Sequence, residues 1–285
     1  MGRINVYKFE QICKACNHWN AKGRPDKVVK LCNYVTKKGD EKQCLSFAKR
    51  MCKITDVSQI QERVIQSSNQ EIAFLYARDV ATADILRLQA ASILNDKEGR
   101  VLHHFSNLKG ANIDFIIDFY MQDKFVQNKA YPLVNVAQSK YITKEQFERI
   151  QKYILDRKVP FECDMLARNC PQCDIKQIEE VIYSSNNTDL IRTFRSCGRN
   201  IDHEKWFNAY KTSMLNSSQS YEDLVVFVRG NKDKLSESDI EQFKEKIIKA
   251  ASYFSDGWDI ADERSQYNEI VKDVKSGEIF ERDTF

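Results

Sequence analysis

Residues 64–69 read Val-Ile-Gln-Ser-Ser-Asn, and residues 181–186 repeat this stretch with one substitution, as Val-Ile-Tyr-Ser-Ser-Asn. A shorter pattern precedes both copies: an acid or amide followed by Ile or Val recurs at steps near 28 residues or about twice that. Its occurrences are Asp56-Val57, Asp84-Ile85, Asn112-Ile113, Asp174-Ile175 and Asn200-Ile201. Self-similarity at such a period indicates a protein built from structural repeats.

Apolar residues return one, four and eight or nine positions after each acid or amide, as on one face of an α-helix. In one copy they are Ile85, Leu88 and Ile93. The acid or amide therefore suits an N-cap, whose side-chain oxygen accepts hydrogen bonds from unpaired N–H groups of the first helical turn. Polar turns at 67–69, 95–97, 184–186 and 216–218 are expected to end the first helix of a unit. A second amphipathic helix should follow each turn.

The second helix of a unit is expected to end in an aromatic residue or Leu, often followed by Ala and a basic or polar residue. Residues 76–78 (Tyr-Ala-Arg) and 166–168 (Leu-Ala-Arg) show this ending. Eight residues separate Tyr76 from Asp84, Leu166 from Asp174, and His104 from Asn112. The constant offset predicts a fixed turn between two helices.

These patterns predict an all-α fold, a right-handed α-solenoid of about seven or eight helical hairpins of roughly 28 residues each. Residues 1–25 are expected to form an N-terminal helical cap, residues 26–254 the repeat array, and residues 255–285 an acidic C-terminal cap or tail. Weaker copies of the unit are expected to open at Asp26, at Tyr141-Ile142 and at Asp239-Ile240. Few prolines and glycines, four and nine, suit long helices with short connections.

The units resemble α-solenoid repeats of the broad HEAT or armadillo type, although they are shorter and lack the tetratricopeptide pattern. They are more similar to degenerate helical-repeat arrays of low-GC bacteria and their phages, in which a Phe-Ala-Arg-Asp-Val-x-x-Ala-Asp-Ile consensus recurs. Residues 76–85 carry this consensus best, and residues 166–175 carry it next best. The resemblance covers about residues 26–254 and implies an architecture but no catalytic residue.

Charge is unevenly distributed along the chain. Residues 1–58 contain 13 Lys or Arg and 5 Asp or Glu, whereas residues 254–285 contain 4 and 9. The basic end carries Lys22, Arg24, Lys27, Lys30, Lys37, Lys38 and Lys42. It could be a solvated helix face, meet an acidic protein surface, or hold nucleic-acid phosphates. The opposite charges of the two ends also allow self-association.

Aromatic residues near the basic end, Tyr7, Phe9, Trp19 and Tyr34, are expected to pack in the core rather than to stack on bases. Nine cysteines without a secretory signal indicate the reducing cytoplasm. No run of about 18 apolar residues predicts a membrane span. Most cysteines should be small buried hydrophobic residues.

A zinc site is the alternative interpretation of the N-terminal cysteines. Cys13 and Cys16, with His18 and Cys32 nearby, have a spacing compatible with tetrahedral coordination. Cys170 and Cys173 form a second Cys-x-x-Cys pair, on the turn of a repeat. Because the first pair falls one helical turn apart in an amphipathic stretch, we expect no metal and no cofactor.

Catalytic motifs are absent from the sequence. It has no Gly-rich phosphate loop, no His-Glu-x-x-His and no Gly-x-Ser-x-Gly, and it has four histidines. The spacing of Arg199 and His203 is one residue short of that used by all-α ribonucleases. Arg24-Pro25-Asp26 resembles the start of a nuclease signature, but no strand is evident to complete that site. We expect His103 and His104 to pack against or cap the end of a second helix.

The function expected from these features is noncatalytic binding of a macromolecule through the solenoid surface, with a protein as partner. The expected contact positions on the repeats are Arg78, Arg87, Arg168, Arg192 and Arg195. A phage- or mobile-element-encoded inhibitor or adaptor of a host or defence complex would fit the resemblance. The alternative is an RNA- or DNA-binding module that uses the basic N-terminal end.

Overall fold

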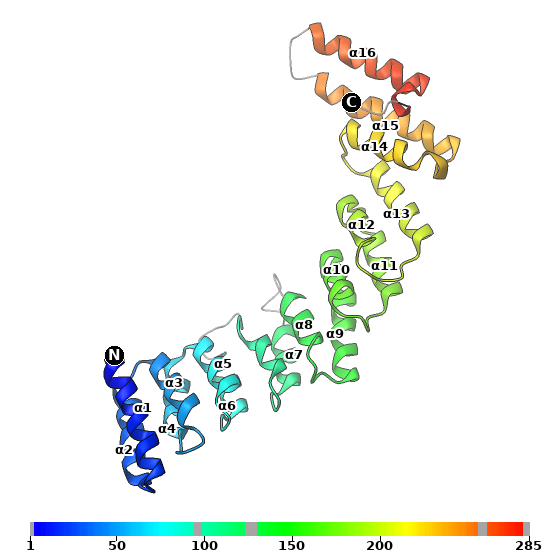
Figure 1. Ribbon diagram of the computed structural model, residues 1–285. Helices are drawn as coiled ribbons and strands as arrows, with labels where there is room; N and C mark the ends of the chain where they lie inside the picture. The colour runs from blue at the N-terminus through cyan, green and yellow to red at the C-terminus, as the bar shows by residue number, and fades with distance from the viewer. Residues whose placement is uncertain (1–2, 94–98, 123–129, 256–260, 282–285) are drawn as a thin grey trace. The chain divides into compact units, whose positions relative to one another are not determined.

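Helices, turns and loops make up the computed structural model, which describes residues 3–93, 99–122, 130–255 and 261–281 (Figure 1). No strand occurs within these ranges, so the all-α prediction is confirmed. The chain divides into two compact units, Met1–Arg157 and Lys158–Phe285. No helix in the described ranges combines the length and apolar composition needed to cross a bilayer.

The first unit contains nine α-helices and one 3-10 helix within its described residues. They are α1 (Val6–Ala21), α2 (Pro25–Lys38), α3 (Glu41–Met51), α4 (Ser58–Ser67), α5 (Gln70–Asp79), α6 (Ile85–Ala91), η1 (Leu102–Asn107), α7 (Ile113–Met121), α8 (Ala130–Ala137) and α9 (Lys144–Arg157). Many of these helices pack on the next helix along the chain and on the next but one, as α1 does on α2 and α3, and α4 on α5 and α6.

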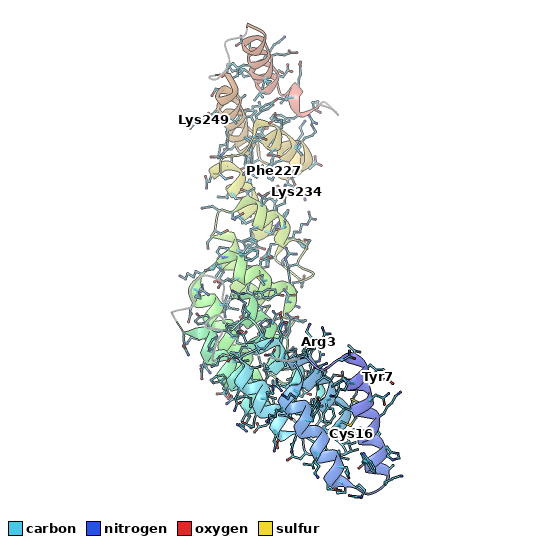
Figure 2. The ribbon with its side chains drawn as sticks, turned by 90° about the vertical axis from the view of Figure 1, so that its left-hand side faces the viewer. Arg3, Tyr7, Cys16, Phe227, Lys234 and Lys249 are labelled. Atoms are coloured by element: carbon cyan, nitrogen blue, oxygen red, sulfur yellow. The ribbon has the colours of Figure 1, made fainter. Side chains whose placement is uncertain are left out.

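Helix α1 illustrates how the pattern of the sequence sets this packing. Phe9, Ile12, Cys13 and Cys16 form its buried stripe at helical spacing, whereas Tyr7 is exposed. Cys16 is fully buried and Tyr7 is exposed; both are labelled in Figure 2.

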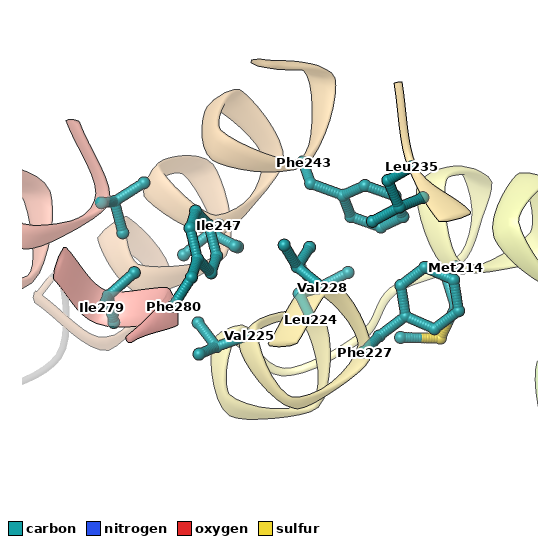
Figure 3. Close-up of a cluster of buried hydrophobic side chains, with 11 residues drawn as sticks. Met214, Leu224, Val225, Phe227, Val228, Leu235, Phe243, Ile247, Ile279 and Phe280 are labelled. Atoms are coloured by element: carbon teal, nitrogen blue, oxygen red, sulfur yellow. The ribbon is translucent and has the colours of Figure 1, made fainter. Parts of the chain in front are cut away.

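The second unit has the same kind of packing. Its elements are α10 (Pro160–Asn169), α11 (Ile175–Tyr183), α12 (Thr188–Phe194), α13 (His203–Asn216), α14 (Tyr221–Asn231), η3 (Lys232–Lys234), α15 (Glu237–Ser255), α16 (Ala261–Ser276) and η4 (Glu278–Phe280). Helix α11 contacts α13, and α13 contacts α15. Its hydrophobic core includes Phe227, which packs against Phe243 with ring centroids 5.1 Å apart (Figure 3).

Three of the predicted N-caps are confirmed. Asp84, Asn112 and Asp174 precede α6, α7 and α11, and each side chain accepts a hydrogen bond from a first-turn N–H group. Asp56 accepts from the Ser58 N–H at 2.8 Å, at the start of α4. These bonds satisfy donors that a helix start otherwise leaves unpaired.

Several predicted unit starts were misplaced. Asp202, not Asn200, caps α13, and it follows Asp174 by 28 residues. Asp239 lies in the first turn of α15, where Ser236 accepts its N–H and donates to its carboxylate. The turn expected at residues 95–97 lies outside the described residues.

A further correction concerns the segment with two histidines. It is a 3-10 helix in which His103 and Phe105 are buried and His104 is exposed. The eight-residue offset had placed His104 where Tyr76 stands in another unit, but Phe105 supplies the buried ring here. A 3-10 helix turns through 120° per residue rather than 100°, so the position that faces the core shifts.

A side-chain hydrogen bond between successive helical repeats recurs at a constant interval. Gln61 and Glu179 accept hydrogen bonds through Oε1 from the N–H groups of Asp84 and Asp202, 23 residues on, at 2.8 and 2.7 Å. Gln89 accepts from the Asn112 N–H at 2.9 Å and donates to its carbonyl oxygen at 2.8 Å, also across 23 residues. All three side chains are buried. These hydrogen bonds connect a helix of one repeat to the N-cap residue of a helix in the next repeat.

Candidate binding surface

The N-terminal hairpin, α1 and α2, carries most of the predicted basic positions. Lys22, Lys30, Lys37 and Lys38 are exposed there, and Lys42 is exposed on α3. Among the described residues, no carboxylate lies within ion-pair distance of Lys30, Lys37, Lys38 or Lys42. These ammonium groups are therefore available to a partner.

Arg24 differs from these lysines because it already has a counterion. Its guanidinium donates two hydrogen bonds to the Asp26 carboxylate, at 3.0 and 3.1 Å. The bonds lower the pKa of Asp26. A partner at Arg24 would have to compete with this neighbouring carboxylate.

Lysine side chains lie over aromatic rings at both ends of the hairpin. The ammonium groups of Lys22 and Lys27 lie 6.0 and 5.7 Å from the centre of the Trp19 ring. At the other end, the Lys8 ammonium lies 5.1 Å from the centre of the Tyr34 ring. These distances are those of cation–π contacts, which hold flexible lysine side chains close to the surface.

Large apolar side chains are also exposed on the hairpin. Tyr7 is 75% exposed and Val6 is 63% exposed, and Val29 and Tyr34 are exposed on α2. They are four of the nine exposed large hydrophobic residues within the described ranges. The expectation that Tyr7 and Tyr34 belong to the core was wrong. Phe9, by contrast, is buried as expected.

The exposure of Val29 can be inferred from its position in the sequence. Val28 and Val29 are adjacent, and the buried stripe of α2 runs through Val28, Cys32 and Val35. Because neighbouring residues of a helix point about 100° apart, only one of the two valines can lie in that stripe. Where two apolar residues are adjacent at the edge of a buried helix stripe, one of them is therefore expected to be exposed on the surface.

The five arginines expected to contact a partner all have intramolecular partners. Arg78 binds Asp79 at 2.7 Å, Arg87 binds Glu62 at 2.8 Å, Arg168 binds Asp164 at 2.8 Å, Arg192 binds Asp189 at 2.9 Å, and the Arg195 guanidinium lies 4.9 Å from the Trp206 ring centre. Arg168 also donates to the Thr193 carbonyl at 2.8 Å. A contact with another molecule at these positions would compete with the existing bonds.

All nine cysteines are buried and free, as expected for small hydrophobic side chains. Burial raises the pKa of Cys13, and it raises the pKa of Cys16 to about 12. Desolvation of the charged thiolate form is the main cause of both shifts. His18 is exposed and packs edge-on against Trp19 at 5.0 Å between ring centroids. In the part of the chain that the structure describes, no three metal-ligating side chains form a metal-binding cluster.

No protein-family model, curated protein or solved structure has significant similarity to the chain. Solvent-accessible side chains of α1, of α2 and of the turn between them form a surface that we call the hairpin surface. It comprises Val6, Tyr7, Lys22, Lys27, Val29, Lys30, Tyr34, Lys37 and Lys38, of which Lys27 is partly buried and the others are exposed.

Proposed function

We propose that the protein is a noncatalytic binding protein that engages an acidic protein partner through the hairpin surface. One observation carries this proposal: unpaired lysines and exposed large apolar side chains occur together on α1 and α2. Monomeric proteins scatter single hydrophobic residues over their surface, whereas grouped ones mark interaction sites. Given the resemblance to helical-repeat arrays of phages, the proposed role is that of an inhibitor or adaptor of a host or defence complex.

The proposal includes a right-handed α-solenoid of about seven or eight hairpins as the scaffold. Two observations support it. Within each of the two compact units, helices contact the next helix but one. In both compact units, a buried Gln or Glu side chain accepts a hydrogen bond from the N–H of an N-cap residue 23 positions later. Val6, Tyr7 and Val29 of the hairpin formed by α1 and α2 are exposed. A bound partner would remove this apolar surface from water.

The chemistry of the surface defines the kind of partner. Tyr7 and Tyr34 offer rigid, amphipathic area of the kind that dominates binding energy at interfaces. The surrounding lysines favour a partner with exposed Asp and Glu, because complementary charge speeds association and fixes orientation. Exposed ion pairs add little affinity, about 0–1 kcal/mol each. The tyrosines and valines should therefore set the affinity, and the lysines the salt dependence of association.

Affinity purification followed by binding measurements tests the proposal. The tagged protein should recover one dominant partner, and Tyr7→Ser combined with Val29→Ser should weaken binding to the purified partner at least about tenfold. Leu86→Ser is the matched control, because Leu86 is exposed on α6, away from the hairpin. An equal loss with the control, or recovery of nucleic acid alone, would reject the proposal. Recovery of the chain itself would identify self-association instead.

Nucleic-acid binding is the second candidate, favoured by Trp19 between Lys22 and Lys27. Aromatic rings flanked by cations bind single strands through stacking and phosphate contacts. Binding of a single-stranded oligonucleotide should then weaken steeply with added salt, since each phosphate contact releases counterions. Replacing Lys22 and Lys27 by Gln should flatten this salt dependence. Absence of binding at low salt would eliminate the candidate.

A further inference from the structure

A cavity of about 900 Å³ lies in the second unit, beside the turn that joins α13 to α14. One wall is formed by residues 215–220 of the turn, and the other by a face of α15. The α15 wall carries Gln242, Glu245, Lys246, Lys249 and Ala250; Lys249 is labelled in Figure 2. Pockets for small organic ligands have volumes of about 300–1,000 Å³, so this cavity could hold one.

Lys246 occupies a fixed position in this cavity. Its ammonium group donates hydrogen bonds to the carbonyl oxygens of Leu215 and, at 2.5 Å, Ser217. These carbonyls lie at the end of α13, where a helix leaves its last acceptors unpaired. An ammonium group has three N–H donors. Two are used here, which leaves one for a ligand.

Lys246 and Lys249 have no counterion among the residues whose side chains the structure describes. Among the described residues, no carboxylate lies within 4 Å of the ammonium groups of Lys246 or Lys249, although Lys244 on the same helix pairs with Glu241 at 2.8 Å. Burial and the nearby Lys249 lower the pKa of Lys246. Two like charges about one helical turn apart repel each other, and partial burial increases the cost. A bound anion would relieve both effects.

Other groups of the cavity complete an anion-binding set. The hydroxyl of Ser218 and the amide of Gln242 belong to exposed lining residues. Helix α14 begins beside the cavity, with Ser220 as its N-cap, and the N-terminal end of a helix carries partial positive charge. Among the lining residues that the structure describes, Glu245 is the one carboxylate, and it is exposed.

We propose that this cavity binds a phosphorylated small molecule, whose phosphate group contacts Lys246 and Lys249. The phosphate would accept hydrogen bonds from the two ammonium groups and from Ser218. The remaining volume would hold the organic part of the ligand, beside Gln242 and Glu245. This site lies outside the hairpin surface and goes beyond the proposed function.

Titration of the full-length protein with phosphate ligands tests the site. Inorganic phosphate and AMP should shift backbone amide NMR signals of residues 215–220 and 242–250, whereas adenosine, which lacks the phosphate, should not shift them. Lys249→Met should weaken phosphate binding at least about tenfold, because it removes a charge without disturbing the end of α13. Glu245→Gln should strengthen binding, because it removes the like charge.

Lys244→Met is the matched control, because Lys244 lies on the same helix but outside the cavity. It should bind phosphate as the unmodified protein does. Melting temperatures of all variants would show that each remains folded. The proposal is overturned if phosphate leaves residues 215–220 unshifted, or if Lys249→Met and Lys244→Met bind phosphate equally well.

Discussion

Gln61, Gln89 and Glu179 show how single polar residues keep one helix in register with another. Each is buried, and each forms a hydrogen bond with the backbone of a residue that caps a helix of the next repeat. Each also stands five positions after an N-cap or its equivalent, Asp56, Asp84 or Asp174. This five-residue spacing is visible in the sequence. The hydrogen-bond partners of these side chains are not, because a polar residue on an apolar helix face does not reveal which backbone group bonds to it.

Gln89→Ala should reduce the stability of the first unit by about 1–3 kcal/mol, because it leaves the N–H of Asn112 without its partner and removes one of the two hydrogen bonds that the Asn112 carbonyl accepts. Urea denaturation would measure the change in the free energy of unfolding. Gln66→Ala is the control, since Gln66 is exposed on α4, and its effect should stay within about 0.5 kcal/mol. Equal effects of the two substitutions would contradict a register role for Gln89.

His103 should make stability depend on pH. Burial and the adjacent His104 lower the pKa of His103 to about 4. The unfolded chain then binds a proton near pH 6.5 that the folded protein does not, so stability falls as pH decreases from about 6.5 to 4. The loss should reach about 1–3 kcal/mol.

Denaturation at pH 7 and pH 5 would measure this effect. His103→Leu should remove most of the difference between the two pH values, whereas His203→Gln, at an exposed position on α13, should preserve it. The carboxylates with lowered pKa values, such as Asp79 and Asp239, contribute stability that is lost only at lower pH. A His103→Leu variant that retains the full difference would contradict the assignment.

Helix starts were the elements that the sequence predicted best. The caps at Asp84, Asn112 and Asp174 could be predicted because side-chain chemistry and apolar spacing agree at each. The start of α13 was placed two residues early, because Asn200-Ile201 matches the dipeptide pattern while Asp202 preserves the 28-residue interval. The 3-10 helix η1 was not predictable, since the eight-residue offset assumes an α-helix throughout.

Helix α14 should depend strongly on Phe227. This side chain is buried between α13 and α15, with Tyr210 and Phe243 both 5.1 Å away between ring centroids. Phe227→Ala should cost about 3–5 kcal/mol through lost burial and the cavity left behind. Hydrogen exchange should accelerate in α13, α14 and α15. Val226→Ala, at the adjacent exposed position, should leave exchange unchanged; a similar acceleration there would contradict the account.

The proposed solenoid can be tested by a measurement on the whole molecule in solution. A compact globule of 285 residues has a radius of gyration of about 19 Å. A chain of stacked hairpins is longer than it is wide, so small-angle X-ray scattering should give a clearly larger value. The measurement needs a concentration series to exclude association. A monomer with a radius near 19 Å would contradict the solenoid.

The charge asymmetry of the molecule was evident in the sequence, but the composition of the hairpin surface was only partly predictable. The basic character of this surface could be predicted from the number of lysines in the N-terminal segment. Tyr7 and Tyr34 were assigned to the core, because the aromatic content of a segment does not reveal which rings have a helix packed over them. The function proposed here depends on those two exposed rings as much as on the lysines.

Hydrogen–deuterium exchange of the protein with and without its purified partner tests the central claim most directly. Binding should slow exchange in residues 6–38, and Tyr7→Ser combined with Val29→Ser should abolish this protection. Protection confined to other helices, with residues 6–38 exchanging as in the free protein, would contradict it.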